Sequence, residues 1–325
     1  MRYCKQISNG ERLFVMARPM RRWSFVLFSL MFFFQQVNAQ STAVSVPWLV
    51  VPTEETTRIR ALVYQEHYQV VQNALTQQSC EHITNYRLGN MILVEAILFC
   101  QALVFGGLRP DIELVPIPNQ PRALEILKKG GSDTAVFTFW RHDAQGKMLF
   151  VSEAMVGVGE YFKGLYTARS NSDMLTIKKP SDLERFIGVV DESWRVDLEV
   201  FNCLKASHSH ISSYPQALRL VHAKRVDYIL HNFASSPGFL HNAFDTELIP
   251  VPGVKVQMPS SLHYFVNQQR INGRRIASAL SRGLRIMRER GIIDRAYEDV
   301  TVFDHRIDDW EAWGCPSDGV LPSAN

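Results

Sequence analysis

The sequence predicts an α/β protein of two lobes with a cleft between them. Strand-like and helix-like segments alternate in the order β-α-β-α-β, and a second block then repeats the alternation. This order is typical of parallel sheets joined by crossover helices. About 286 residues remain when a leader of 39 residues is removed from the 325, which is long for one core and comfortable for two.

The first block carries three strand patterns and two helix patterns. Strands are predicted over Arg58–Tyr64, over 112–117, which alternates, and over Thr134–Phe139, which is apolar throughout. The run Leu88–Gly107 is apolar, has helix length and ends in glycines. The segment 120–131 predicts a short helix, with a proline near its start and glycines at its end.

The second block begins at residues 179–186, "KPSDLERF". Ser181 is the predicted N-cap and Glu184, three residues later, completes a predicted capping box. Further helices are predicted over 194–207 and 215–225, and further strands over Ile187–Val190, Val226–Leu230 and Leu262–Asn267.

Eight arginines lie between Arg270 and Val300. Apolar residues such as Ile276, Leu280 and Leu284 share one arc at helical spacing, and most of the arginines take the other arc. This pattern predicts an amphipathic helix with a solvated basic face. Binding of nucleic acid or of an anionic membrane surface is the alternative, and the charge of the rest of the chain does not favour it.

A basic stretch ending at Arg22, the apolar run Trp23–Phe34 and the small residues Val37 and Ala39 predict a signal peptide cleaved after Ala39. The run is shorter than the roughly 20 residues of a membrane-spanning helix, which is the alternative. The leader holds six basic residues and one acidic residue of the 35 and 32 in the whole chain. The exported part therefore has 29 basic and 31 acidic side chains, a net charge of −2, and the predicted location is the periplasm.

The exported part holds four cysteines: Cys80, Cys100, Cys203 and Cys315. An even number in an oxidising compartment allows two disulfides in three connectivities. Cys80 and Cys100 are close in sequence, so we predict that they pair and pin the loop before the first long helix to that helix. The alternative is that some cysteines are buried thiols, and the pairing of Cys203 and Cys315 is left open.

The segment 278–300, "SALSRGLRIMRERGIIDRAYEDV", resembles the closing segment of periplasmic solute-binding proteins of extracellular family 3, which have the type 2 periplasmic-binding fold. There the chain ends with an amphipathic helix, a turn and a short helix containing tyrosine. In this sequence Gly291, Ile293, Asp294 and Tyr297 match that pattern.

Three further stretches are similar to segments of that family, and the resemblance covers residues 58–300. They are 178–194, 217–232, and 123–137 followed by "FVSEAM" at 150–155. The resemblance implies two lobes, each a mostly parallel sheet flanked by helices, with the ligand in the cleft between them. The implied division is 1–39 signal peptide, 40–57 lead-in, 58–161 lobe one, 162–259 lobe two, 260–300 return to lobe one, and 301–325 C-terminal tail.

Two departures from the family argue against an ordinary zwitterionic amino acid as ligand. Family members hold its carboxylate with an arginine, but Gln145 stands there and Arg141 lies four residues earlier. The family's acidic partner of the amino group falls at Asn232. We therefore expect a polar or acidic solute whose acidic group Arg141 meets through two parallel hydrogen bonds.

Ligands of open α/β sheets bind at the carboxyl ends of the strands, and this rule selects the remaining candidates. The predicted ligand-binding residues are Tyr64, Glu66, Thr138, Trp140, Arg141 and Gln145 in lobe one, and Ser193, Trp194, Arg195, His231 and Asn232 in lobe two. For the two tryptophans the alternative is packing, for Arg141 it is a surface ion pair, and for Arg195 it is a solvated helix position.

The resemblance implies an exported, monomeric solute-binding protein that delivers its solute to an ABC transporter, with no cofactor, nucleic acid or stable membrane insertion. One alternative is a binding protein that feeds a sensor or another partner. Another is a periplasmic enzyme of the small-acid dehydratase type, for which Glu66 and His231 are the groups to test. No catalytic motif supports it, and His208 and His210 form a possible metal pair without a third ligand.

Overall fold

The structure is a computed structural model that describes residues 56–87, 90–144 and 148–315. The predicted signal peptide and its cleavage site lie outside these residues, as do Gln145 and most of the lead-in. Among the described residues, none of the helices is both long enough and apolar enough to cross a membrane.

The first sheet has a parallel core, as predicted, which antiparallel strands extend. Its order is β2-β1-β3-β14-β5. β1 (Thr56–Tyr64) pairs in parallel with β2 (Arg109–Ile117) and with β3 (Thr134–Ala135). β14 (Phe265–Asn267) then runs antiparallel to β3 and to β5 (Leu149–Val151), so the chain returns to this sheet late.

Helices cover both faces of the first sheet. The odd-numbered apolar residues of β1 belong to the core that includes α1 (Tyr68–Gln77), α2 (Met91–Phe105) and α6 (Gly273–Glu289). Leu62 points the other way and packs with α3 (Gln120–Lys128). This division follows from the alternation of side chains along a strand.

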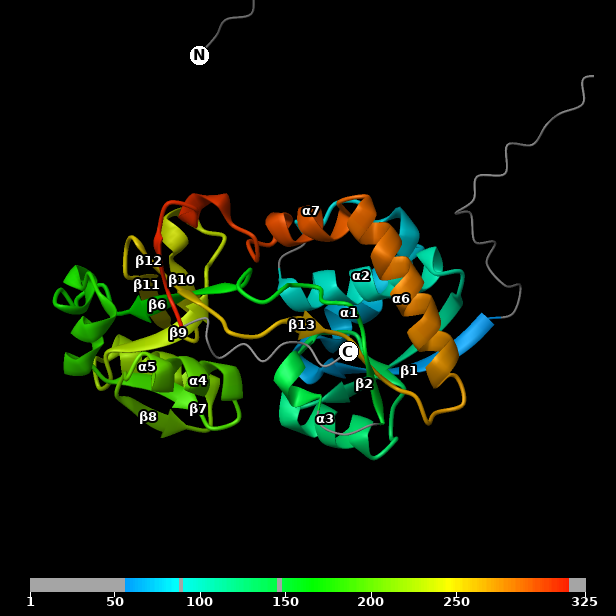
Figure 1. Ribbon diagram of the computed structural model, residues 1–325, viewed down its shortest axis with the longest axis horizontal. Helices are drawn as coiled ribbons and strands as arrows, with labels where there is room; N and C mark the ends of the chain where they lie inside the picture. The colour runs from blue at the N-terminus through cyan, green and yellow to red at the C-terminus, as the bar shows by residue number, and fades with distance from the viewer. Residues whose placement is uncertain (1–55, 88–89, 145–147, 316–325) are drawn as a thin grey trace, which may run out of the picture. The chain divides into compact units, whose positions relative to one another are not determined.

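The helices α2 and α6 lie side by side (Figure 1). A Cβ atom added at Gly283 would lie 1.7 Å from the carbonyl oxygen of Ala102, and one added at Gly106 would lie 1.9 Å from that of Ala279. Glycine at these two positions therefore allows the backbones to touch, and the predicted amphipathic helix is confirmed as a packed surface helix.

The second sheet also combines a parallel core with antiparallel strands. Its order is β10-β11-β6-β9-β7-β8, in which β9, β7 and β8 are parallel and β6 is antiparallel to β9. The strands are β6 (Phe162–Thr167), β7 (Gly188–Asp191), β8 (His208–Ile211), β9 (Tyr228–Asn232), β10 (His241–Ala243) and β11 (Thr246–Pro250).

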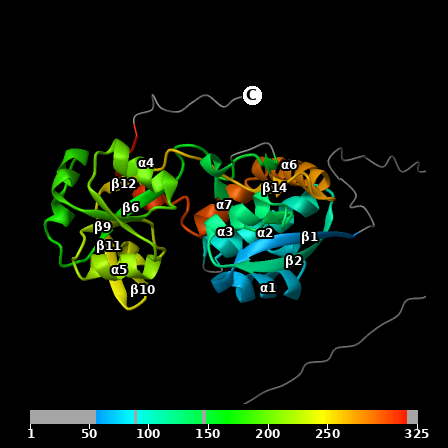
Figure 2. The same cartoon turned by 90° about the horizontal axis from the view of Figure 1, so that it is seen from below.

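One helix packs on each face of the second sheet, as Figure 2 shows. Val190 belongs to the core with α4 (Arg195–Cys203), and its neighbour Val189 belongs to the core with α5 (Tyr214–His222). Consecutive residues of a strand face opposite sides, so β7 joins the two layers.

The predicted capping box at Ser181 is wrong. Residues Pro180–Arg185 form a 3-10 helix that already contains Ser181. Proline at the first position starts the helix one residue before the predicted N-cap. The carboxylate of Asp182, rather than that of Glu184, accepts hydrogen bonds from the backbone N–H groups of Lys178 and Lys179, the two residues just before the helix.

Two predicted strands are each divided in the structure. Thr134–Phe139 is split into β3 and β4 (Phe139–Trp140), and Leu262–Asn267 into β13 (Leu262–His263) and β14. β4 and β13 pair with each other as a separate two-stranded sheet. The break in the first strand has a cause, since the N–H of Thr138 donates to the side chain of Glu95 rather than to a strand.

The C-terminal segment, predicted as a tail, returns to the second sheet. After α7 (Ile292–Asp299) and a turn at His305–Ile307, β15 (Glu311–Trp313) pairs in parallel with β12 (Val254–Gln257). β12 in turn pairs with β6. Other short 3-10 turns lie at Met174–Thr176 and Pro237–Phe239.

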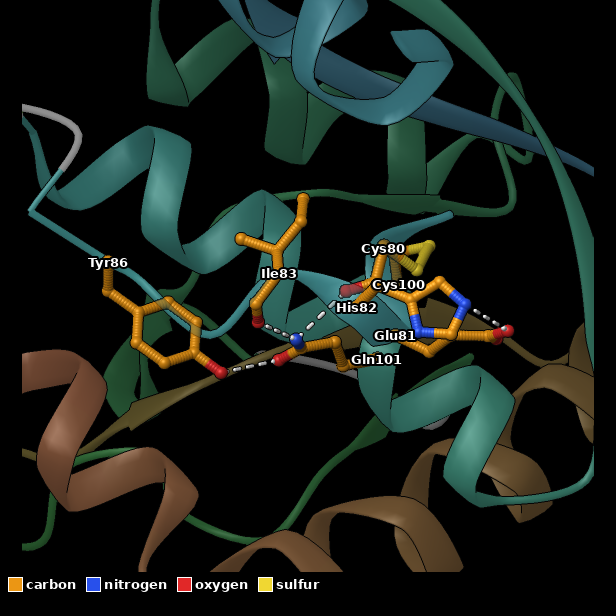
Figure 3. The surroundings of a disulfide bond; sticks show 7 residues. All are labelled: Cys80, Glu81, His82, Ile83, Tyr86, Cys100 and Gln101. Carbon is orange, nitrogen blue, oxygen red and sulfur yellow. Dashed lines mark hydrogen bonds and ion pairs between the residues drawn. A yellow bond between two sulfur atoms is a disulfide. The ribbon is translucent and has the colours of Figure 1, made fainter. Parts of the chain in front are cut away.

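The predicted disulfide between Cys80 and Cys100 is confirmed, and it joins the turn Cys80–His82 to α2 (Figure 3). Beside it the amide of Gln101 donates to the carbonyl oxygens of Cys80 and Ile83. Cys203 and Cys315, whose pairing the sequence left open, form the second disulfide, between α4 and the segment after β15. Each bond restricts the unfolded chain.

Candidate ligand-binding site

A cavity of about 260 Å³ is lined by side chains from the helices and loops that connect the strands of both sheets. The first residues of four helices line it: Met91 of α2, Gln120 of α3, Arg195 of α4 and Tyr214 of α5. Helices α3, α4 and α5 each follow a strand directly, so their N-termini lie at the sheet edge where α/β proteins bind ligands, whereas α2 follows α1 and the turn Cys80–His82. Helix N-termini favour anionic groups.

Seven of the predicted ligand-binding residues line this cavity. They are Thr138, Trp140, Ser193, Trp194, Arg195, His231 and Asn232. The rule that selected them was their position after the ends of strands, and the structure brings them together from both sheets. Their role in binding stays a prediction.

Of the other four predicted residues, three are described by the structure and do not line the cavity. Tyr64 ends β1 and stacks on Phe137, with ring centroids 4.2 Å apart. Glu66 lies exposed in the turn Gln65–His67, where its carboxylate is 3.6 Å from His67. Gln145 lies outside the described residues.

Arg141 is the third described residue that was predicted to bind the ligand and does not line the cavity. It begins the 3-10 turn Arg141–Asp143, its side chain is exposed, and its backbone N–H donates to the carbonyl oxygen of Ser261. Trp140 lines the cavity and Arg141 does not, and the charge of Arg141 acts instead on His263. The predicted contact of Arg141 with an acidic ligand stays a prediction that would require the side chain to turn inward.

Seven polar or charged lining residues were not predicted: Glu95, Gln120, Asp143, Tyr161, Lys163, Asp197 and Tyr214. One of them carried a signal in the sequence. Glu95 is the single charged residue of α2, whose other residues are almost all apolar. A carboxylate within a helix that is otherwise fit only for burial indicates a buried polar site.

Glu95 is 1% exposed and accepts three hydrogen bonds. One carboxylate oxygen accepts from the N–H of Thr138 at 3.0 Å, and the other from the Thr138 hydroxyl at 2.5 Å and from Tyr297 at 3.3 Å. No cation is paired with it among the described residues. Desolvation raises the pKa of Glu95 to about 7, although the bonds from Thr138 and Tyr297 oppose that rise.

A second buried carboxylate in the wall does have a cation. Lys163 of β6 lies 2.7 Å from Asp197 of α4, and the two side chains are only 14% and 4% exposed. The ion pair joins the antiparallel strand β6 to the helix that packs on the same sheet. It is therefore both part of the wall and a link within the second layer.

Aromatic rings line the cavity on both sides. Trp140 meets Tyr161 edge to face, with ring centroids 5.5 Å apart, and Trp194 lies 6.3 Å from Tyr214. Both tryptophans were predicted for ligand contact, with packing as the alternative. In the structure each lines the cavity and also packs against a tyrosine.

Like Glu95, His231 and Asp143 of the wall have pKa values shifted towards their neutral forms. Desolvation, followed by the nearby His241, lowers the pKa of His231 to about 3. Desolvation also raises the pKa of Asp143, against the opposing effect of Arg195. Perturbed groups in a cavity are typical of functional sites. Among the described residues no three His, Cys, Asp or Glu side chains are placed to hold a metal ion.

Comparison with known proteins gives similarity in structure but not in sequence. No protein-family model matches the chain, and no curated protein matches it. The periplasmic domain of BvgS from B. pertussis is similar in structure, with a TM-score of 0.51 and 13% sequence identity. The match covers 77% of this chain and 44% of that chain, so this chain spans less than half the length of its match.

Two further solved structures have TM-scores below 0.5. ArgBP from T. maritima, as a P235GK mutant, gives 0.46 at 16% identity and covers 65% of this chain and 86% of that one. AbpA from Streptococcus pneumoniae, an amino acid transporter substrate-binding protein bound to L-arginine, gives 0.47 at 16% identity, over 65% and 85%. The likeness to the BvgS periplasmic domain and the strand order of the two sheets show that the chain has the mixed α/β, two-lobed type 2 periplasmic-binding fold that its sequence predicted.

Proposed function

We propose that this chain is an exported protein that captures a small polar solute in the cavity of about 260 Å³. The observation that carries the proposal is the convergence there of four helix N-termini, two tryptophans and charged side chains from both sheets. Small-ligand sites are concave, mostly pre-formed, and combine apolar faces with a few fixed polar groups.

The wall suits a solute that carries polar groups of both signs. An anionic group fits the helix N-termini and Arg195, because both present positive charge to the cavity. A cationic group fits Glu95, since that carboxylate is buried without a paired cation in the described part of the chain. In this proposal Arg195 takes the role that the sequence assigned to Arg141.

The proposed setting is the periplasm, with the predicted signal peptide, lead-in and two lobes, of which the second also includes β15, and the proposed partner is an ABC importer. A sensor or other receiving partner is the second candidate. The similarity to part of the BvgS periplasmic domain, a chain more than twice as long as the matched region, favours it. Both candidates need the same cavity, and neither needs catalysis.

The test is a thermal-shift screen of the purified chain against amino acids, organic acids, sugars and polyamines, because a ligand that binds only the folded state stabilises it. We expect at least one class to raise the melting temperature in a concentration-dependent way. Absence of any stabilising solute across the classes would contradict the proposal.

Two arginine variants then identify the group that holds an acidic part of the solute. Arg195→Ala should weaken binding about tenfold to a hundredfold, the effect of losing hydrogen bonds to a charged group. Arg141→Ala should leave the dissociation constant unchanged if its side chain remains outside the cavity. The reverse result would restore the role predicted from the sequence and move the acidic group to the β4 side of the cavity.

A further inference from the structure

Two histidines and one tyrosine converge beside the proposed solute cavity. The phenol oxygen of Tyr214 lies 2.6 Å from Nε2 of His231 and 3.1 Å from Nε2 of His241. The centroids of the two imidazole rings are 4.2 Å apart. Because the three residues come from α5, β9 and β10, the fold and not the local sequence brings them together.

The tautomer of His231 is fixed by its backbone neighbour. Its Nδ1 lies 2.8 Å from the carbonyl oxygen of Asn232, which can only accept, so the proton is on Nδ1. The lone pair is then on Nε2, the atom that faces Tyr214. A histidine that donates from one ring nitrogen to a carbonyl and presents the other is arranged as metal-binding histidines are.

The phenol oxygen lies almost as far from each imidazole Nε2 as two ligand atoms of one metal ion lie from each other. Metal bonds of about 2.0–2.1 Å place neighbouring ligand atoms about 2.9 Å apart at right angles and about 3.3 Å apart in a tetrahedron. The observed separations of 2.6 Å and 3.1 Å lie close to these values. Both histidines also line a second cavity of about 530 Å³, which gives a path for entry and room for a further ligand.

We propose that Nε2 of His231, Nε2 of His241 and the deprotonated phenol oxygen of Tyr214 bind a divalent transition-metal ion of the copper and zinc class. Imidazole suits both metals. On binding, the ion replaces the phenol proton, which leaves to solvent, so one proton is released for each ion bound. The open position faces the second cavity. This site goes beyond solute capture and does not depend on it.

Charged groups of both signs lie near the three residues. Lys163 is the cation that acts on His231, and its charge is matched by Asp197 at 2.7 Å. Burial, followed by the effects of Tyr166 and Glu66, raises the pKa of the Tyr214 phenol, so the ion has to displace a proton that the free protein holds tightly. Tyr166 packs edge to face on both imidazole rings and is held by its own bonds to Phe239 and Ala234, so it shields the site without competing for the ion.

The experiment is a titration of the tag-free, metal-free chain with Cu²⁺, followed by calorimetry and visible absorption, and by displacement with Zn²⁺. We expect one tight equivalent and a phenolate-to-copper charge-transfer band. Tyr214→Phe should abolish the band, and His231→Ala or His241→Ala should weaken binding by more than about tenfold, since even outer-shell changes cost that much.

The other histidine pair supplies the control. His208 and His210 lie on β8 with ring centroids 5.1 Å apart and no tyrosine between them, so replacing both with alanine should leave the tight equivalent intact. If the wild type binds no ion tightly, or binds it equally well without His231 and His241, the site does not exist. If a variant fails to fold, electron paramagnetic resonance of the wild-type copper complex decides, because two imidazole nitrogens must appear in its hyperfine pattern.

Discussion

Glu95 and Asp197 are two buried carboxylates in the wall of one cavity, and they differ in whether a cation is paired with them. Asp197, on the side of the second sheet, is paired with Lys163 at 2.7 Å. Glu95, on the side of the first sheet, accepts hydrogen bonds from Thr138 and Tyr297 and is paired with no cation among the described residues.

The difference shows how burial decides the state of a carboxylate. Hydrogen bonds alone do not offset the desolvation of Glu95, so burial raises its pKa to about 7. Burial raises the pKa of four nearby tyrosines, and the Glu95 carboxylate adds to each rise; they are Tyr64, Tyr161, Tyr264 and Tyr297. One side of the cavity is thus internally neutralised, and the other can accept a positive charge.

Breaking the ion pair should give the largest effect. Lys163→Met leaves Asp197 buried and unpaired, which should lower the free energy of unfolding by about 3–5 kcal/mol. Urea denaturation measures this loss. The double variant Lys163→Met, Asp197→Leu should recover most of it, because no buried charge remains.

The control for that experiment is an exposed ion pair of the same second sheet. Arg169 and Glu247 are 3.1 Å apart, with side chains 65% and 46% exposed. Arg169→Met should cost only about 0–1 kcal/mol. Equal losses for Lys163→Met and Arg169→Met would contradict the importance of burial.

The pH dependence of stability tests Glu95. Its folded pKa of about 7 exceeds the ordinary value of 4.5, so the folded state holds the proton more tightly. Its contribution is full below pH 4.5 and is lost as the pH rises to about 7, a change of about 3 kcal/mol. In Glu95→Gln this part of the pH dependence should disappear. If the free energy of unfolding, measured by urea denaturation, changes with pH in the same way for both proteins from pH 4.5 to 7.5, the raised pKa of Glu95 is refuted.

The helix that carries Glu95 should be sensitive to its contact with α6. Gly283→Ala places a Cβ against the backbone of Ala102, so we expect a loss of about 1–3 kcal/mol from overpacking. Arg285→Ala, at an exposed position of the same helix, should change the free energy of unfolding by less than about 0.5 kcal/mol. Equal behaviour of the two variants in thermal unfolding would show that α2 and α6 can separate without cost.

The smallest effect concerns the hydroxyl that binds Glu95. Thr138→Val removes one donor but keeps the backbone N–H, so stability should fall by about 0.5–1.5 kcal/mol. Because that hydroxyl lowers the pKa of Glu95, the variant should shift the pH dependence towards higher pH. A shift in the opposite direction, measured on the same urea series, would contradict this assignment.

Local pattern was enough to predict the elements that build the two sheets. The apolar run that became α2, the alternation of β2 and the amphipathic α6 are each visible in consecutive residues. The disulfide between Cys80 and Cys100 could be predicted because the two cysteines are near in sequence and belong to one helix and the loop before it. Position at the end of a strand was sufficient to predict that Trp140 and Trp194 lie in the wall of the cavity.

The rest depends on residues that are distant in sequence. The hydrogen bond between Glu95 and Thr138 joins residues 43 positions apart in the sequence, and the ion pair of Lys163 and Asp197 joins residues 34 positions apart. Local spacing therefore predicts neither pair. β15 pairs with a strand more than 50 residues earlier, and a strand of three residues is too short to show a periodicity that would predict it. The orientation of Arg141 depends on the turn after β4, which the sequence alone left undefined.

The most direct test of the account is calorimetric titration of the solute from the screen into the wild type and into a variant whose cavity is filled. Ser193 lines the cavity and is exposed, so Ser193→Trp should block the space without disturbing the core. We predict that the wild type binds one solute per chain, that Ser193→Trp abolishes binding, and that both proteins unfold with the same cooperativity. Undiminished binding by a folded Ser193→Trp variant would contradict the claim that this cavity is the binding site.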